Sequence, residues 1–372
     1  MYTRTPLLYW SLTRLVRKPS QPHFLRLPTV AITTMPPKRK NSNAPVKPAK
    51  KKKTWEPFDP TLPRNVTLPE DMTFPKAPEG SIKLASFNVG GLNSSIKKGF
   101  KNYVAAENAD IIFLQETKVN QPVSTAVDDK VYKYRYWAFD DKKGYSGVAV
   151  FSKYKPEKVE RGLPDYDEGS RGRVITLYFP AFTLVACYVP NSGDKLKNLE
   201  RRKVFNQHME KFLRSLQKEG RAVIWAGDLN VAHTRKDIAR PDTNTRSAGF
   251  TVEERADFDR VLATSTDGND LPGLIDTWRH FHPETEGHYT YYSYRFQCRS
   301  KLIGWRLDYF VVTPDLMDKV VESEIRQIAY GASDHVPLVL VLKDVDMGNA
   351  ANASSPEEDN DSNDTSETSD AT

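Results

Sequence analysis

The stretch Ala222-Val223-Ile224-Trp225-Ala226-Gly227-Asp228-Leu229-Asn230 joins an apolar run to a polar turn. The apolar residues 222–226 include β-branched and aromatic side chains, which predicts a strand buried on both faces. Gly227 then permits a sharp turn, and Asp228 and Asn230 follow at the strand exit. The stretch therefore places two polar side chains at the point where a buried strand leaves the core.

Seven further runs resemble this strand, and two helices are well marked. The other predicted strands are Ile82–Phe87, Asp110–Leu114, Gly147–Phe151, Arg173–Phe179, Phe182–Val189, Leu307–Val312 and Pro337–Leu342. One helix carries its apolar stripe on Phe205, Met209, Phe212, Leu213 and Leu216 and ends before Gly220. The other begins at the capping box Thr251-Val252-Glu253-Glu254. Strands mixed with helices, without an internal repeat, predict one α/β domain of two packed sheets flanked by helices.

Both ends of the chain differ from its middle. Residues 1–53 carry 13 Lys and Arg and no acid, whereas residues 344–372 carry 9 Asp and Glu and no Lys or Arg. We therefore expect a possible mitochondrial transit segment at 1–34, a basic disordered arm and linker at 35–79, a folded body at 80–343 and an acidic disordered tail at 344–372. No apolar run reaches the roughly 20 residues that a membrane span needs.

The basic arm contains two address-like features. Residues 1–34 are rich in arginine and free of acids, as transit peptides are, and Met35 is followed by Pro36-Pro37-Lys38-Arg39-Lys40 and by Lys50–Lys53. Such clusters are typical of nuclear import signals or nucleic-acid-binding arms, although a solvated basic linker remains the alternative. We expect a protein of the nucleus and the mitochondrion that is made from two translation starts. Only two cysteines are present, so a disulfide framework is not expected.

Several predicted strand exits carry polar groups that a hydrophobic core does not need. They are Asn88 before Gly90 and Gly91, Glu116, Asp228, Asn230, Asp308, Asp334 and His335. Any one of them could be an ordinary turn former or helix cap. Together they offer the oxygen-rich ligand set that Mg²⁺ prefers, and such a metal can polarise a phosphoryl oxygen.

Seven ordered motifs carry a family resemblance. They are Ser86–Leu92, Leu114–Lys118, Gly144–Val148, Tyr188–Asn191, Gly227–His233, Gly304–Phe310 and Ser333–His335. Over about residues 80–343 the chain resembles the exonuclease III-like abasic-site endonucleases, above all the human-type eukaryotic enzymes. The resemblance implies a four-layered α/β sandwich of the endonuclease/exonuclease/phosphatase type, with two mainly antiparallel or mixed β-sheets packed face to face and helices outside.

The resemblance also implies the site and its roles. The implied ligands of Mg²⁺, with Mn²⁺ as a substitute, are Asn88, Glu116, Asp228, Asn230, Asp334 and His335. The implied catalytic residues are Tyr188, Asp228, Asn230, Asp308 and His335, with Asp228 moving a proton and Asp308 orienting His335. The implied substrate-binding residues are Lys118, Tyr145 and Asn191 on the DNA backbone, and Tyr291, Trp305 and Leu307 around a flipped-out sugar. Ordinary core packing is the alternative for the aromatic side chains.

The activity that the resemblance implies belongs to base excision repair of DNA damage. The expected reaction is hydrolysis of double-stranded DNA 5′ to an abasic site, which leaves a 3′-hydroxyl and a 5′-deoxyribose phosphate. We also expect 3′-phosphodiesterase and 3′–5′ exonuclease action, and a monomer. Two alternatives stay open: another phosphodiesterase on the same architecture, acting on inositol phosphates, sphingomyelin or undamaged DNA, and a DNA-binding protein that has lost catalysis.

Five positions depart from the human-type pattern. Gly90 replaces a candidate metal-shell Asp or Asn, and Tyr291 replaces a Phe. Asp194 and Asn198 stand where the pattern has DNA-contacting arginines, and Arg295 stands where it has an apolar wedge. We therefore expect changed metal affinity and a changed grip on DNA, with hydrolysis itself preserved.

Overall fold

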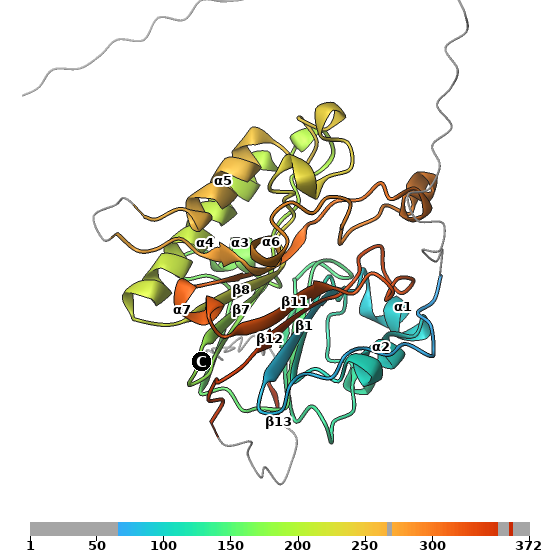
Figure 1. Cartoon of the computed structure of the whole chain (residues 1–372), viewed down its shortest axis with the longest axis vertical. Coiled ribbons are helices and arrows are strands. Elements are labelled where there is room, and N and C mark those ends of the chain that lie inside the picture. Colours follow the sequence, from blue (N-terminus) through green and yellow to red (C-terminus); the bar gives the residue numbers. More distant parts are fainter. Residues whose placement is uncertain (1–65, 266–269, 349–356, 360–372) are drawn as a thin grey trace, which may run out of the picture. The chain divides into compact units, whose positions relative to one another are not determined.

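Two β-sheets pack face to face in the body of the protein, with helices on both outer faces (Figure 1). The computed structural model describes residues 66–265 and 270–348 in full, and the backbone of residues 357–359. The predicted transit segment and the basic clusters lie outside these residues. Within the described ranges, no helix combines the length and apolar character that crossing a bilayer would require.

The first sheet contains strands from both ends of the body. Its strands are β1 (Ile82–Asn88), β2 (Ile111–Gln115), β3 (Tyr134–Ala138), β4 (Val148–Ser152), β11 (Val320–Ile325), β12 (Leu338–Leu342) and β13 (Glu357–Asp359). They lie in the order β11-β12-β1-β2-β4-β3-β13. β1 pairs with β2 in parallel and with β12 antiparallel, so the sheet is mixed.

The second sheet is built from the middle of the chain. Its strands are β5 (Lys158–Arg161), β6 (Val174–Tyr178), β7 (Thr183–Tyr188), β8 (Val223–Asp228), β9 (Ile275–Asp276) and β10 (Asp308–Val312). They lie in the order β5-β6-β7-β8-β10-β9. β8 pairs with β7 in parallel and with β10 antiparallel, so this sheet is mixed as well.

Helices cover the outer face of each sheet. α1 (Leu92–Lys97) and α2 (Phe100–Glu107) share an apolar cluster with the first sheet, and α4 (Leu199–Lys218) and α5 (Val252–Leu262) share one with the second. α3 (Asp167–Ser170) contacts α4, α6 (Thr277–Phe281) contacts β10 and β11, and α7 (Pro314–Met317) joins those two strands. The short 3-10 helices are η1 (Ser124–Ala126), η2 (Asp194–Leu196), η3 (Arg235–Asp237), η4 (Pro241–Thr243), η5 (Arg295–Gln297) and η6 (Arg299–Lys301).

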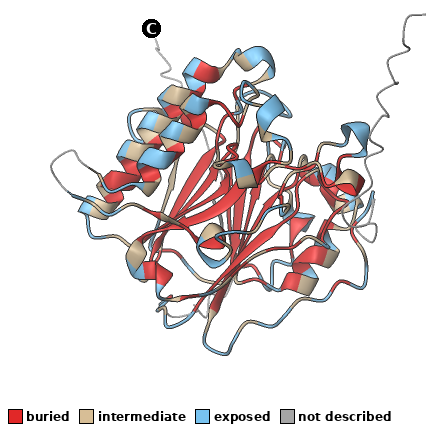
Figure 2. Cartoon of the chain, turned by 45° about the horizontal axis from the view of Figure 1, so that its top comes forward, coloured by how far each residue is buried: buried red, intermediate tan, exposed pale blue. Residues whose placement is uncertain are grey.

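Alternating side chains divide the core into layers. Leu84 of β1 and Ile224 of β8 face the space between the sheets, whereas Phe87 and Trp225 on the same strands face the helices. Strands covered on both faces read as continuous apolar runs rather than as alternating ones. Figure 2 shows the sheets largely buried and the outer helices with exposed faces. The predicted four-layered sandwich is therefore confirmed.

The predicted elements agree closely with the structure. All eight predicted strands are present, and both predicted helices form, with Thr251 and Glu254 making the expected capping box on α5. No pattern in the sequence predicted β3, β5, β9, β11 or β13. β5 and β11 expose part of their length and carry charged residues, which weakens the apolar signal of a strand. Cys187 and Cys298 are buried free thiols, as expected without a disulfide framework.

Both ends of the body contain more structure than composition predicted. Leu68 and Met72, placed by prediction in the linker, join the cluster between the first sheet and its helices, so packing begins before residue 80. The Leu68 amide donates to the Lys98 carbonyl at 2.7 Å. In the predicted disordered tail, residues 357–359 pair with β3 because the edge of a sheet presents unpaired backbone groups.

Candidate active site

Strand ends from both sheets converge on one group of polar side chains. Asn88 ends β1, while Tyr188 and Asp228 lie opposite each other at the ends of the parallel strands β7 and β8. Asp308 begins β10 and lies opposite Asp228, because β10 runs antiparallel to β8. The loop before β12 adds His335, since β12 runs antiparallel to β1. The topology thus gathers residues that are more than 200 positions apart in the chain.

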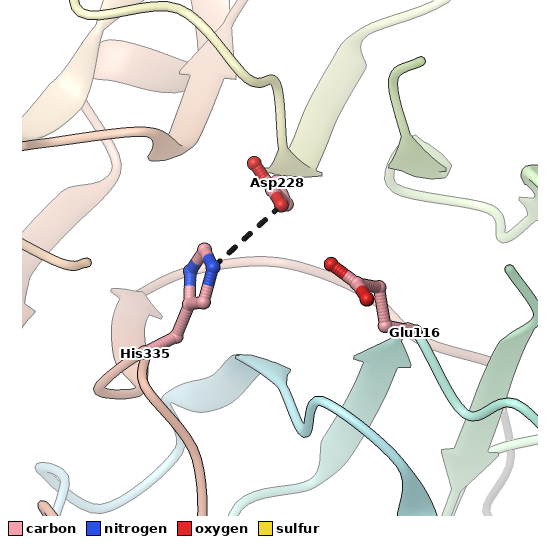
Figure 3. Close-up of side chains that lie close together, drawn as sticks. All are labelled: Glu116, Asp228 and His335. Carbon is pink, nitrogen blue, oxygen red and sulfur yellow. Dashed lines mark ion pairs between the residues drawn. The ribbon is translucent and has the colours of Figure 1, made fainter. Parts of the chain in front are cut away.

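Glu116, Asp228 and His335 form the centre of this group (Figure 3). Each offers one potential ligand atom, and these three atoms lie within 4.8 Å of one another. The Asn88 amide links the two carboxylates: its Nδ2 donates to Glu116 Oε1 at 3.1 Å and to Asp228 Oδ2 at 2.8 Å. Two carboxylates with an imidazole and a neighbouring amide suit a hard divalent cation.

His335 is oriented by Asp308. Its Nδ1 lies 2.8 Å from Asp308 Oδ2, and its Nε2 lies 3.9 Å from Asp228 Oδ2. Because the carboxylate accepts from Nδ1–H, the Nε2 side of the ring is turned towards the centre of the group. Asp308 is itself fixed, since its backbone amide donates to Thr290 Oγ1 at 3.1 Å. The expected pairing of Asp308 with His335 is present in this geometry.

Burial and charge set the protonation of the central residues. Burial and the neighbouring Asp308 carboxylate raise the pKa of Asp228 above its usual value. Burial would lower the pKa of His335, but the charges of Asp308 and Asp228 outweigh it and raise that pKa to about 10. Burial likewise opposes ionisation of Glu116, yet Lys118 lowers its pKa. A bound cation would favour ionised carboxylates further, because positive charge stabilises them.

A rigid loop holds Asn230 beside Asp228. The Asn230 backbone amide donates to Asp228 Oδ1 at 2.9 Å, and its side chain donates to the Val189 carbonyl at 2.9 Å. Asn191 Nδ2 donates to Asn230 Oδ1 at 2.8 Å. Arg202 on α4 is buried and donates to the carbonyls of residues 190, 229 and 230. These bonds preorganise the polar groups at the ends of β7 and β8.

A cleft of about 450 Å³ opens over these residues. Its lining consists of Glu116, Tyr188, Asn191, Asp228, Asn230, Ser247, Ala248, Tyr291, Ser293, Trp305, Leu307, Asp334 and His335. Asn88 and Asp308 do not line the cleft but hold residues that do. Asp334 lines the cleft without joining the three-residue cluster of potential ligands.

One wall of the cleft is aromatic and apolar. Backbone hydrogen bonds of 2.8 and 3.0 Å join Tyr291 to Trp305, and the Tyr291 ring centroid lies 5.0 Å from that of His335. Leu307 belongs to a small apolar cluster that includes Phe250, against which Tyr291 and Trp305 pack. The three predicted pocket residues therefore lie together and beside the polar centre.

A buried ion-pair network supports this wall from behind. Arg306, between Trp305 and Leu307, donates from Nε to Asp237 Oδ1 at 2.7 Å and from Nη2 to Asp276 Oδ2 at 2.7 Å. Arg306 and Asp237 are fully buried. Because a buried charge without its partner is costly, this network fixes the backbone from which the wall side chains project.

Lys118 and Tyr145 lie outside the lining of the cleft. Lys118 Nζ is 2.7 Å from Glu116 Oε2. The Tyr145 hydroxyl accepts from Arg173 Nη2 at 3.0 Å, and the Arg173 guanidinium lies 4.9 Å from the Tyr188 ring centroid. Lys118 thus contacts the cleft residue Glu116 directly, and Tyr145 is connected to the cleft residue Tyr188 through Arg173. The charge of Lys118 and the cations Lys142 and Arg173 over the Tyr145 ring suit the predicted backbone-binding role, which stays a prediction.

Some residues of the site do not stand at strand exits and were not predicted. Ser247, Ala248 and Ser293 line the cleft from loops with no distinctive pattern. Arg202 carried a readable signal, because it occupies the apolar stripe of its helix three residues before Phe205. Arg306 carried one too, since a charge flanked by Trp305 and Leu307 at the start of a buried strand requires a buried partner.

Comparison with known proteins agrees with this geometry. The endonuclease/exonuclease/phosphatase family model matches residues 85–335. A DNA-(apurinic or apyrimidinic site) endonuclease from Dictyostelium discoideum is 41% identical over 271 residues, 72% of each chain. The DNA repair nuclease APEX1 of Danio rerio is 39% identical over 265 residues, which are 70% of this chain and 82% of the relative.

A solved structure adds the three-dimensional likeness. The crystal structure of an AP endonuclease from Leishmania major superposes with a TM-score of 0.62 at 28% identity, over 74% of this chain and 93% of that one. The fold and the sequence identity to two abasic-site nucleases indicate the same family as the motifs around the cleft. The chain belongs to the endonuclease/exonuclease/phosphatase family, and within it to the exonuclease III-like abasic-site endonucleases.

Proposed function

We propose that this enzyme is an abasic-site endonuclease of base excision repair that hydrolyses the phosphodiester 5′ to the lesion. The products are a 3′-hydroxyl and a 5′-deoxyribose phosphate. The observation that carries this proposal is one cleft in which Glu116, Asp228 and His335 adjoin an apolar wall. The polar centre suits a phosphodiester, and the wall suits a sugar that has lost its base.

The apolar wall supplies the selection for damage. A cleft of about 450 Å³ bounded by Tyr291, Trp305 and Leu307 accommodates a deoxyribose turned out of the duplex. Turning out a nucleotide costs stacking and pairing energy, and an abasic nucleotide costs least. The enzyme therefore selects the lesion without reading a base sequence.

The polar residues divide the chemistry among them. Asp228 is within reach of the reacting phosphate and, with its raised pKa, exchanges a proton with the attacking water. His335 presents Nε2, held by Asp308, to a non-bridging phosphate oxygen. Tyr188 donates a hydrogen bond as negative charge builds on the phosphate, and its fixed position makes that bond effective. Asn230, whose Nδ2 donates to the Val189 carbonyl at 2.9 Å and to Asp228 Oδ2 at 3.3 Å, holds the Asp228 carboxylate in place.

The family is metal-dependent, and the cleft has a fitting set of donors. We propose Mg²⁺, held by Glu116 and Asp228 with Asn88, Asn230, His335 and Asp334 around it, and with Mn²⁺ as a substitute. When bound, the cation supplies Lewis-acid stabilisation of charge on the phosphate. The ion pair from Lys118 to Glu116 keeps that carboxylate ionised.

A substrate comparison tests the proposed function. Purified full-length protein is incubated with an abasic duplex, an undamaged duplex and an inositol polyphosphate, each with and without Mg²⁺. We expect cleavage of the abasic duplex at least about 100-fold faster than that of the other two, and only with the metal. Extruding a nucleotide that keeps its base costs a few kcal/mol more, which corresponds to a factor of about 100 in rate. Preferential hydrolysis of the inositol polyphosphate would assign the cleft to another phosphodiesterase.

Further activities belong to the same cleft. We propose 3′-phosphodiesterase and 3′–5′ exonuclease action, because both reactions also hydrolyse a DNA phosphodiester beside a sugar at a strand end. A labelled duplex with a blocked 3′ end and one with a plain 3′ end measure these rates separately. If neither is cleaved while the abasic duplex is, the wall admits internal lesions alone.

We further propose that the basic arm binds DNA phosphates and directs the protein, a monomer, to the nucleus and the mitochondrion. Residues 1–53 carry 13 positive charges, and contacts to phosphates release counterions. Removing the arm should flatten the dependence of DNA binding on salt while turnover on abasic DNA stays unchanged. An identical slope would leave the arm a targeting role alone, and imaging of proteins started at Met1 and at Met35 tests the two destinations.

A further inference from the structure

The edge of the first sheet is covered by the chain's own acidic tail. β13 pairs in parallel with β3, with Glu357 opposite Tyr134, Glu358 opposite Arg135 and Asp359 opposite Tyr136. On its other side β3 pairs with β4. Without β13, β3 would be the edge strand of the first sheet. All five side chains of β3 are buried. A strand in this position would otherwise present unpaired N–H and C=O groups to solvent.

Three basic residues lie in β3, directly before it or in contact with it. Lys133 precedes the strand and Arg135 lies within it. Arg161, which ends β5 of the second sheet, donates from Nε to the Trp137 carbonyl at 2.8 Å, so the edge strands of the two sheets meet here. Lys133, Arg135 and Arg161, together with residues 134–136 of β3, are called the β3 dock below.

The tail has the opposite charge. Residues 344–372 carry 9 Asp and Glu and no Lys or Arg, and three consecutive acids, Glu357–Asp359, form the paired strand. The single proline of the tail, Pro356, comes directly before this strand, so every residue of the strand keeps its backbone N–H. Charge and backbone chemistry therefore both favour the same segment at the same edge.

We propose that the β3 dock is a binding site for an extended acidic peptide, and that the tail of the same chain fills it. Backbone hydrogen bonds provide the pairing, as when a peptide adds a strand to a sheet, and the basic residues select an acidic strand. Because Arg161 already donates to the Trp137 carbonyl, the dock ends at Tyr136 and takes a three-residue strand. Tethering raises the effective concentration of the tail, so weak pairing suffices.

The β3 dock is also open to acidic segments of other proteins. A three-residue strand is short, so the tail leaves the dock readily and an acidic extended segment of another protein can take its place. The dock uses none of the residues that line the cleft. Cleavage of abasic DNA therefore continues whether the tail is docked or displaced, and the dock is an attachment surface rather than a switch of catalysis.

Hydrogen exchange of the full-length protein tests the dock. Exchange in a peptide covering residues 134–138 is compared between the full chain, a chain ending at residue 355 and a chain ending at residue 359. We expect exchange at least about fivefold faster in the shorter chain, the factor expected from one net backbone hydrogen bond. The chain ending at 359 keeps β13 and should retain most of the protection. Equal exchange in the full chain and the chain ending at 355 would overturn the proposal.

Point variants separate backbone pairing from charge. The double variant Glu358→Pro and Asp359→Pro should expose β3, because neighbouring amides of a strand point to opposite sides and one proline removes an N–H that faces β3. Lys133→Glu should weaken protection, and 0.5 M salt should do the same to the wild type by screening charge. Lys218→Glu, at an exposed position in the last turn of α4, is the matched control. An effect of Lys218→Glu equal to that of Lys133→Glu would refute the electrostatic part.

Two further measurements identify the occupant. A synthetic peptide with residues 353–364 should restore protection to the chain ending at residue 355, and the same peptide with prolines at 358 and 359 should not. Protection in the full chain should not change over a 100-fold range of protein concentration. Loss of protection on dilution would assign the dock to the tail of a second copy and overturn the intramolecular assignment. Unchanged turnover on abasic DNA confirms that each variant is folded.

Discussion

Replacing Asp308 by asparagine removes a charge while keeping the shape of the side chain. The Asp308 carboxylate accepts from Nδ1 of His335 at 2.8 Å, and an amide oxygen can accept the same hydrogen bond. The ring orientation should therefore persist. What changes is the pKa of His335, because the charge of Asp308 is the largest influence that raises it against burial.

The size of the effect follows from the protonation of the imidazole. With its pKa raised to about 10, His335 is almost fully protonated at pH 8. If the substitution returns that pKa to its ordinary value of about 6.5, roughly 3% remains protonated at pH 8, so a step that needs the imidazolium slows about thirtyfold. A raised pKa keeps the protonated form present at alkaline pH, and the alkaline limb of the rate profile should therefore move to lower pH in the variant.

Single-turnover cleavage of an abasic duplex between pH 5.5 and 10 measures this shift. The loss should be largest at alkaline pH and small near pH 5.5, where the imidazole of the variant is protonated again. Asp259→Asn is the matched control, because Asp259 lies 2.6 Å from His233 but does not line the cleft. A loss that is the same at every pH, or an equal shift in the control, would refute the charge-based role of Asp308.

Three further predictions concern proton transfer, stability and the metal. Asp228→Asn should slow single-turnover cleavage at least about 100-fold while binding of abasic DNA measured by anisotropy persists; a loss below about tenfold would move the proton-transfer role elsewhere. Asp237→Asn leaves Arg306 short of a buried partner and should reduce the free energy of unfolding by about 3–5 kcal/mol in urea, against about 0–1 kcal/mol for Asp242→Asn at an exposed pair. Burial opposes ionisation of Asp237, but the charge of Arg306 outweighs burial and lowers the pKa of Asp237. The stability that this carboxylate contributes is therefore present above its unfolded pKa of about 3.9 and is lost as the pH falls through its folded pKa. A stability difference between wild type and Asp237→Asn that grows in acid would contradict the pairing. Gly90→Asp should lower the half-saturating Mg²⁺ concentration, because the new carboxylate adds a group that can reach the metal or its waters. Gly90 has a φ of 57°, and a Cβ there would lie 3.3 Å from Ser333 Oγ, so a thermal melt must accompany the titration. A variant that melts normally and needs the same or a higher Mg²⁺ concentration would refute the idea that Gly90 leaves a metal ligand missing.

Most of the fold was predictable because its central strands are covered on both faces. β2, β4, β8 and β12 consist mostly of uninterrupted apolar runs, and such runs have no other stable place than a core. β5 and β11 at the sheet edges carry charges on partly exposed faces, so their sequences resemble loops. The pairing of β13 depends on an unpaired edge far away in the sequence, which no local pattern reveals.

The site was predictable where polar groups follow buried strands. Glu116, Asp228 and His335 meet because their strands end at the same side of two packed sheets, which the strand pattern and the motif order together indicate. Residues that act from loops or helices were not predictable, since their positions depend on tertiary packing. Ser247 reaches the cleft from a loop, and Arg202 reaches the Asn230 loop from the buried side of α4.

The ends of the cleaved strand test the central claim most directly. A duplex with one abasic site, labelled at its 5′ end, is cut once with Mg²⁺ present, and the product is compared on a sequencing gel with authentic markers. Hydrolysis by the residues around Asp228 and His335 predicts one product with a 3′-hydroxyl that a DNA polymerase extends without further processing. A product with an unsaturated aldehyde at its 3′ end, or cleavage that persists unchanged in EDTA, would contradict metal-assisted hydrolysis at this cleft.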